Sequence, residues 1–181
     1  MAPFVILDRD GVINEDSPEY IKSPEEWIPV DGSLDAIAAL TRAGVDVYIA
    51  TNQAGVARGK LTLTSLKSIH KKMLDQIRAA GGDIREIACC LHHPNDACEC
   101  RKPRPGMLLD LAQHHNLVLP EGYFVGDSEK DMAAAHAAGC QGVLVLTGNG
   151  QATLEANPDH QPVFRDLAAF TQHLLTIFDQ D

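Results

Sequence analysis

A chain of 181 residues with a formal net charge of −10 is a poor match for nucleic acid or an anionic membrane, because both partners are themselves polyanionic. The length fits one domain over residues 1–181, and a composition of 45% hydrophobic and 22% charged residues is typical of a globular protein that needs no disulfide framework. The N-terminal stretch lacks the basic region of a signal peptide and the length of a membrane span, so we expect a cytoplasmic protein, and a monomer.

Five short apolar runs along the chain are bounded by glycine or aspartate, which is typical of strands buried on both faces. They cover Phe4–Asp8, Val45–Gln53, Ile84–Leu91, Gly122–Ser128 and Gly142–Gly148. Helical patterns alternate with them over residues 32–44, 63–82, 105–115, 129–139 and 166–175. Thr64 or Ser65 is the predicted cap of the second helix, and the segment Gly148–Pro162 is predicted to be a loop.

Strands that alternate with helices predict right-handed crossovers and therefore an α/β fold, a doubly wound, Rossmann-like parallel sheet with helices on both faces. Such sheets bind ligands at the carboxyl ends of their strands. Here those ends carry Asp8, Thr51-Asn52-Gln53 and Gly126-Asp127-Ser128. We therefore expect the functional site at that edge.

The first predicted strand ends in two aspartates, Asp8 and Asp10, across a turn that Gly11 makes easy. Two carboxylates so close together repel each other, which favours a bound cation. In isolation this pattern would indicate only an acidic turn. However, Asp127 and Asp131 add carboxylates at another strand end, and Mg²⁺ is typically held by one or two carboxylates together with phosphate oxygens and water.

Four stretches, Asp8-x-Asp10, Thr51, Lys102 and Gly126-Asp127-Ser128-x-x-Asp131, resemble in this order the four sequence motifs of the haloacid-dehalogenase superfamily of phosphatases. The resemblance implies that Asp8 is the nucleophile and forms an aspartyl-phosphate, and that Asp10 is the general acid and base. It also implies that Thr51 and Lys102 bind the phosphoryl oxygens.

For the catalytic metal, the same resemblance implies a Mg²⁺ ion held by the side chains of Asp8 and Asp127 and by the backbone carbonyl of Asp10. Asp131 is expected to support these ligands or to orient Lys102, with Ser128 beside it.

Four of the five cysteines lie in one segment, and an odd, clustered set indicates a metal site or free thiols rather than disulfides. Residues two apart in an extended chain point the same way, which pairs Cys90 with His92 and Cys98 with Cys100. This Cys₃His set fits a closed, structural Zn²⁺ site. Cys89 and His93, which are four residues apart, are the competing ligands, and Cys89 is predicted instead to pack as a small hydrophobic residue.

The superfamily often inserts a cap domain, but too few residues separate Asp10 from the first predicted helix, and the segment from Thr51 to Lys102 is filled by one helix, one strand and the cysteine loop. We therefore expect a capless member. The cysteine loop, with "DRDGVIN" and "ATNQAGVARG", resembles the D,D-heptose 1,7-bisphosphate phosphatases. These remove the C7 phosphate of a small phosphorylated sugar on the route to the ADP-heptose of lipopolysaccharide core.

The residues that this resemblance implies for substrate contact are Asp16 to Tyr20, Asn52, Gln53 and Arg101. Histidinol-phosphate phosphatases share the same motifs and zinc loop, and they are the alternative. Two more distant alternatives fit less well. A receiver-type signalling domain would not need Asp10 or the zinc loop, and a DNA 3′-phosphatase is disfavoured by the net charge of −10.

Overall fold

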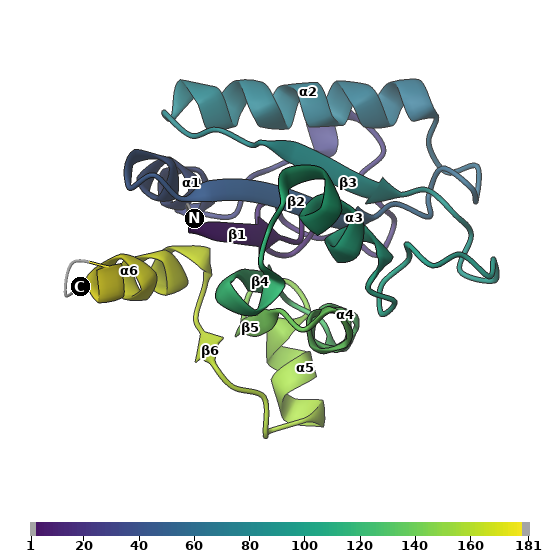
Figure 1. Cartoon of the computed structure of the whole chain (residues 1–181). Helices are drawn as coiled ribbons and strands as arrows, with labels where there is room; N and C mark the ends of the chain where they lie inside the picture. The colour runs from purple at the N-terminus through teal and green to yellow at the C-terminus, as the bar shows by residue number, and fades with distance from the viewer. Residues whose placement is uncertain (1–2, 179–181) are drawn as a thin grey trace.

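All five predicted strands form, and they lie side by side in one parallel sheet (Figure 1). The computed structural model describes residues 3–178. The sheet order is β3-β2-β1-β4-β5-β6, which reverses direction between β1 and β4, and this is where such folds place their ligands. The strands are β1 (Phe4–Leu7), β2 (Asp46–Asn52), β3 (Glu86–Cys90), β4 (Tyr123–Gly126), β5 (Gln141–Val145) and β6 (Val163–Phe164). The expected doubly wound α/β fold is confirmed.

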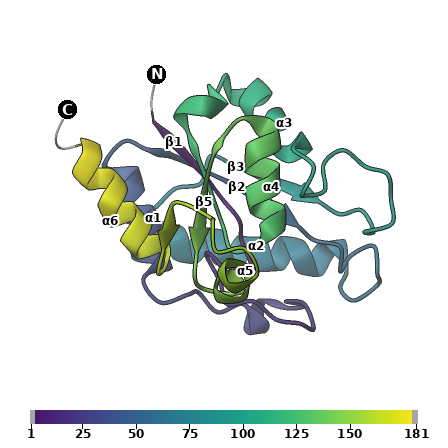
Figure 2. The ribbon, with the colours of Figure 1, turned by 90° about the horizontal axis from the view of Figure 1, so that it is seen from below.

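Helices cover both faces of the sheet (Figures 1 and 2). On one face α1 (Ser33–Arg42), α2 (Leu63–Ala79) and α6 (Leu167–Phe178) pack against Val5 and Leu7 of β1. On the other face α3 (Gly106–His115) and α4 (Glu129–Ala138) pack against Phe4 and Ile6. Since neighbouring residues of β1 enter opposite cores and all four are buried, β1 is the centre of the fold and its carboxyl end is held rigidly.

Three local features differ from the sequence prediction. The segment predicted as a loop contains a short helix, α5 (Gly150–Ala156), followed by the two-residue strand β6. Only Gly150 of α5 is buried, so the helix has no apolar stripe to reveal it. Helix α2 is capped by Thr62, whose hydroxyl accepts from the backbone N–H of Ser65 at 3.0 Å, because the helix starts one residue before the predicted cap.

In the described part of the chain, residues 3–178, no separate layer covers the carboxyl edge of the sheet. The segment between β1 and α1 holds a turn, a loop and one short 3₁₀ helix, η1 (Pro24–Glu26), and it is anchored by the buried Trp27. Lys72 of α2 donates to the carbonyls of Pro24 and Trp27 and ties this loop to the core. A second 3₁₀ helix, η2 (Leu119–Glu121), precedes β4. Within residues 3–178, no helix has both the length and the apolar character needed to span a bilayer.

Candidate active site

A polar cavity of about 470 Å³ opens at the carboxyl ends of β1, β2 and β4. Its walls contain the predicted catalytic, substrate-binding and magnesium residues except Thr51, which is fully buried, and Pro18 and Glu19 of the Asp16 to Tyr20 segment. The lining residues are Asp8, Asp10, Asp16, Ser17, Tyr20, Ile21, Asn52, Gln53, Arg101, Lys102, Asp127, Ser128, Glu129, Lys130, Asp131 and Asn149. The strand-end prediction therefore brings together residues that are up to 120 positions apart in the chain.

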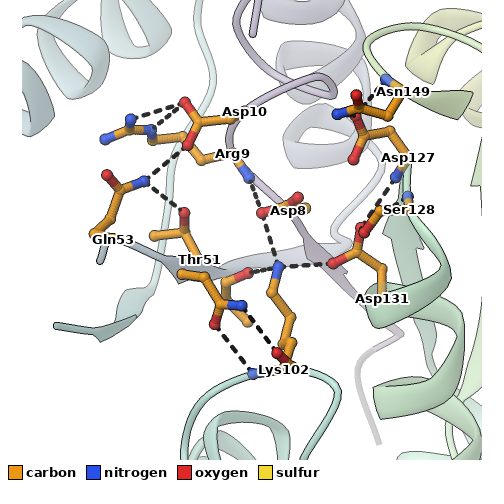
Figure 3. Close-up of polar contacts among 12 residues, drawn as sticks. Asp8, Arg9, Asp10, Thr51, Gln53, Lys102, Asp127, Ser128, Asp131 and Asn149 are labelled. Carbon is orange, nitrogen blue, oxygen red and sulfur yellow. Dashed lines mark hydrogen bonds and ion pairs between the residues drawn. The ribbon is translucent and has the colours of Figure 1, made fainter. Parts of the chain in front are cut away.

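Lys102 lies at the bottom of the cavity between two carboxylates (Figure 3). Its Nζ is 2.8 Å from Asp8 Oδ1 and 2.7 Å from Asp131 Oδ1, and it donates to the carbonyl of Ala50 at 2.9 Å. Burial alone would lower the pKa of Lys102, but the two carboxylates outweigh it and hold the pKa above its ordinary value. The ammonium is therefore charged and fixed beside Asp8.

The end of β2 supplies three polar side chains with different partners. Thr51 is fully buried, and its hydroxyl accepts from Gln53 Nε2 at 2.9 Å. Gln53 Nε2 also donates to Asp10 Oδ2 at 2.8 Å. The amide of Asn52 spans the backbone of Lys102, with Nδ2 3.1 Å from its carbonyl and Oδ1 3.0 Å from its N–H. Asn52 thus holds Lys102 in place as well as lining the cavity.

Asp127 follows β4 and sits in a space that only glycines leave open. Both Gly11 and Gly148 have positive φ angles, +83° and +56°, and a Cβ atom on either would overlap Asp127 Oδ2. Asn149 donates to the same oxygen from its backbone N–H at 2.7 Å and from its side chain at 3.1 Å. Its side chain also donates to Asp16 Oδ2 at 2.9 Å, which links Asp127 to the loop after β1.

Asp131 contacts both the start of α4 and Lys102. It forms a capping box with Ser128 at the start of α4, and its Oδ2 accepts from the backbone N–H groups of Asp127 and Ser128 and from the hydroxyl of Ser128. The other oxygen, Oδ1, faces Lys102. Asp131 therefore orients both the lysine and the backbone that carries Asp127.

The charges at this site fit a divalent cation. Oxygens of Asp8, Asp127 and Asp131 lie within 4.8 Å of one another, and Lys102 neutralises only one of the three charges. Burial is the main reason why the pKa of Asp127 rises to about 7, and burial together with the charge of Asp131 raises the pKa of Asp8 well above its ordinary value. Hard carboxylate oxygens that lack a counter-charge are what Mg²⁺ requires.

We expect Mg²⁺ to stabilise the protein more at pH 8 than at pH 5. The pKa values of Asp8 and Asp127 are raised in the folded protein, to about 7 for Asp127. Below about pH 4 both groups are protonated in the folded and in the unfolded chain, and the metal-free protein has its full stability with respect to them. This stability is lost as the pH rises through the pKa values of the folded state. Mg²⁺ binds the ionised carboxylates and removes this cost. At a concentration of about 100 times its dissociation constant it should raise the melting temperature by roughly 5–10 °C at pH 8.

Thermal unfolding with and without added Mg²⁺ at the two pH values measures this effect. Asp127→Asn is the control and should abolish the shift. Equal shifts at pH 5 and pH 8 would contradict the assignment.

A second cluster, Cys90, His92, Cys98 and Cys100, brings one ligand atom from each residue within 4.8 Å of the others. The Sγ atoms of Cys90 and Cys98 are 3.8 Å apart, and His92 Nδ1 is 3.6 Å from Cys90 Sγ. In a tetrahedral site with Zn–S of about 2.3 Å and Zn–N of about 2.0 Å, neighbouring ligand atoms lie roughly 3.5–3.8 Å apart. Cys100 Sγ is closer to His92 Nδ1, at 3.1 Å, and the donor set of three thiols and one imidazole fits zinc.

The competing ligands Cys89 and His93 take no part in this cluster. Cys89 packs against the core on the side of α2, and burial raises the pKa of its thiol to about 12. The ring of His93 accepts at Nδ1 from the backbone N–H of Asn95, inside the loop.

Four residues at the site were missed by the sequence analysis: Arg9, Asn14, Lys130 and Asn149. Arg9 and Asn14 belong to the turn after β1 and both donate to Asp10 Oδ1. The sequence feature that could have revealed Arg9 and Asn14 is that they are polar residues inside a stretch that is otherwise apolar and buried. Asn149 follows the end of β5, so the strand-end rule that found Asp127 also applies to it.

The sequence matches the family model for HAD-hydrolase-like proteins over residues 99–170. A protein of Pseudomonas putida named D-glycero-beta-D-manno-heptose-1,7-bisphosphate 7-phosphatase is 49% identical over 173 residues, covering 95% of this chain and 99% of the relative. The Escherichia coli K12 protein of the same name is 37% identical, covering 81% of each chain.

Solved structures that resemble this chain include enzymes with the same kind of name. The D,D-heptose 1,7-bisphosphate phosphatase of B. bronchiseptica, solved with magnesium and phosphate, superposes with a TM-score of 0.94 at 47% identity, covering 97% of this chain and 99% of the other. The enzyme of the same name from Burkholderia thailandensis has a TM-score of 0.76 at 36% identity, over 96% of this chain and 99% of the other.

Proposed function

The chain belongs to the HAD-like family of D-glycero-β-D-manno-heptose-1,7-bisphosphate 7-phosphatases, and from this membership we propose that it removes the C7 phosphate of that sugar. The observation that carries the proposal is the pairing of Asp8 with Lys102 at the bottom of the polar cavity, beside a buried group of carboxylates. Relatives with the same name span nearly the whole chain, and this favours the heptose substrate over the histidinol phosphate that the sequence left as an alternative.

In the first step, a carboxylate oxygen of Asp8 attacks phosphorus and the bond from phosphorus to the C7 oxygen breaks. The geometry supports this role, because the Arg9 N–H and Lys102 both bind Asp8 Oδ1 and leave Oδ2 free to react. Lys102 and the Thr51 hydroxyl then stabilise the phosphoryl oxygens as their charge moves. The product of this step is an aspartyl-phosphate on Asp8.

Asp10 donates a proton to the leaving C7 oxygen and then takes one from the water that attacks the aspartyl-phosphate, which releases inorganic phosphate. Although burial alone would raise its pKa, the charge of Arg9 and hydrogen bonds from Asn14, Arg9 and Gln53 hold the pKa of Asp10 below its ordinary value. A phosphate dianion bound beside Asp10 shifts this pKa upward and so prepares it to carry the proton.

Two metal ions complete the proposal. Mg²⁺ would be held by Asp8, Asp127 and the backbone carbonyl of Asp10, and when bound it offsets the repulsion between a carboxylate nucleophile and a phosphate dianion. Zn²⁺ would be held by Cys90, His92, Cys98 and Cys100 and would fix the loop that delivers Arg101 and Lys102.

The second phosphate of the substrate needs its own positive charge. Besides Lys102, the cationic side chains that line the cavity are Arg101 and Lys130, and both also border the groove beside the cysteine loop. Arg101 Nη1 is buried without a hydrogen-bond partner, so a residue that lines the cavity has an unmatched guanidinium donor. We propose that Arg101 and Lys130 bind the C1 phosphate, while Asp16, Tyr20, Asn52 and Gln53 surround the sugar.

We expect Arg101→Ala to raise KM for the heptose bisphosphate by about 10- to 100-fold with little change in kcat, because a charge-assisted hydrogen bond to phosphate is worth roughly 1.5–3 kcal/mol. Steady-state kinetics on the bisphosphate and on a sugar monophosphate without the C1 group measure this effect, and only the bisphosphate should respond. Arg85→Ala, which removes an exposed arginine paired with Asp46, is the control. An equal loss on both substrates would refute the assignment.

We also propose that the protein is a monomer. The cysteines of the proposed zinc cluster are free thiols. Because thiols stay reduced in the cytoplasm, we propose that the enzyme is cytoplasmic.

The test of the proposed function is a phosphate-release assay on the 1,7-bisphosphates of heptose and on histidinol phosphate. We expect kcat/KM to be far higher for a heptose bisphosphate. A preference for histidinol phosphate would overturn the substrate while leaving the phosphatase chemistry intact.

A further inference from the structure

Arg9 is an arginine enclosed in the core next to Asp10, and its guanidinium holds down the pKa of that carboxyl although Arg9 does not line the active-site cavity. The residue is 0% exposed. A buried guanidinium persists only where its charge and its N–H groups are matched. Its Nε and Nη2 atoms donate to Asp10 Oδ1 at 3.1 and 2.8 Å, which Figure 3 shows, and its Nη1 is 3.1 Å from His70 Nε2.

The Arg9 side chain has two partners, Asp10 and His70, and of these His70 comes from another element of the fold. It lies on α2, 61 positions further along the chain, whereas Asp10 belongs to the same turn as Arg9. Arginine has no acceptor, so Nε2 of His70 must accept the hydrogen bond, and the ring is neutral with its proton on Nδ1. Burial and the charge of Arg9 lower the pKa of His70 to about 4, which agrees with a neutral ring at physiological pH.

We propose that His70 is a positioning residue for Asp10, acting through Arg9. The ring fixes one end of the guanidinium, and the other two nitrogens then hold the Asp10 carboxylate toward the leaving oxygen. The role of Asp10 that this inference extends rests on the proposed function. His70 itself is absent from the residues that line the cavity, so it acts without touching the substrate.

Other contacts of Asp10 do not replace this arrangement. Asn14 Nδ2 reaches Oδ1 at 3.0 Å and Gln53 Nε2 reaches Oδ2 at 2.8 Å, but neither carries a charge. If His70 loses its acceptor, Nη1 of Arg9 is buried without a partner, and the guanidinium must turn to find one. Its Nε and Nη2 atoms then move away from Asp10, which loses both its ion pair and its orientation.

Three variants separate positioning from simple packing. His70→Leu keeps an apolar side chain of similar volume but has no acceptor. In His70→Gln, the amide oxygen can reach the position of Nε2 and accept from Arg9. In His70→Asn, the side chain is polar but too short to reach. His136→Leu removes an exposed histidine on α4 and is the control.

The readout is kcat/KM of the Mg²⁺-loaded protein on two substrates, an alkyl phosphate that the wild type hydrolyses and p-nitrophenyl phosphate. An alkoxide leaves only if Asp10 protonates it, whereas p-nitrophenolate leaves without a proton, so displacement of Asp10 affects the first substrate selectively. We expect His70→Leu and His70→Asn to lose about 10- to 100-fold on the alkyl phosphate and less than about threefold on the aryl phosphate. His70→Gln should recover most of the loss.

Equal losses on the two substrates, a wild-type rate in His70→Leu, or a His70→Gln variant no better than His70→Asn would each overturn the proposal. If His70→Leu fails to fold, the comparison of the Gln and Asn variants still decides the question. The assay works with any alkyl phosphate that the wild type accepts, so it can succeed even if the heptose bisphosphate is the wrong substrate.

Discussion

Asp8→Asn should lower kcat by at least about four orders of magnitude, because the carboxamide that replaces the carboxylate is not a nucleophile. No other carboxylate can substitute for it. Asp131 is paired with Lys102 and accepts hydrogen bonds at the start of α4. Asp10 is held by hydrogen bonds from Arg9, Asn14 and Gln53. Steady-state and single-turnover phosphate release measure the loss.

The same variant should fold as well as the wild type or better in the absence of metal. Burial and the nearby charge of Asp131 raise the pKa of Asp8, so its ionised form costs free energy in the metal-free protein at neutral pH, and the neutral amide removes that cost. The melting temperature without Mg²⁺ should therefore not fall. Asp83→Asn, at an exposed position, is the control for the loss of one negative charge. Turnover near the wild-type rate in Asp8→Asn would rule out the aspartyl-phosphate mechanism.

Loss of the zinc cluster should cost about 100-fold or more in kcat/KM, although none of its four ligands lines the active-site cavity. Cys100 is two residues before Lys102, and the backbone between them carries Arg101. On its other side, Lys102 is held by the amide of Asn52. Without the metal the loop loses one of its anchors, and although Asn52, Ala50 and Asp131 still contact Lys102, we expect Lys102 to move away from Asp8.

Cys98→Ser tests this expectation. We expect the wild type to contain close to one zinc per chain by elemental analysis, and the variant to contain far less and to lose activity with it. Cys89→Ala is the matched control, because Cys89 is in the same strand as Cys90 but its thiol packs against the core outside the cluster. A folded and fully active wild-type protein free of zinc would contradict the structural role.

The meeting of polar residues at the strand ends could be predicted because the physics that gathers them is simple, whereas Lys102 was predicted from the resemblance to the phosphatase motifs. Parallel strands end at one edge, so Asp8, Thr51 and Asp127 must meet there whatever the details of packing. The grouping of these four side chains could be predicted because residues two apart along an extended chain point the same way, which pairs Cys90 with His92 and Cys98 with Cys100.

Other features depend on tertiary packing that the sequence pattern does not encode. The contact between His70 and Arg9 depends on how α2 is rotated over the end of β1, and an isolated helical histidine gives no sign of it. Asn52 was predicted to bind substrate, yet the direction of its amide toward Lys102 emerges only when the cysteine loop is in place. Helix α5 and strand β6 are too short and too exposed to produce a period.

The central claim is that the phosphate on C7 is transferred at Asp8 while the phosphate on C1 is held and kept. Phosphorus NMR of the reaction, with Mg²⁺-loaded protein and D-glycero-β-D-manno-heptose 1,7-bisphosphate, observes both groups at once. We expect the C7 signal to disappear as one equivalent of inorganic phosphate forms, the C1 signal to remain, and Asp8→Asn to leave both signals unchanged. Loss of the C1 phosphate before the C7 phosphate, or conversion of the substrate by Asp8→Asn, would contradict it.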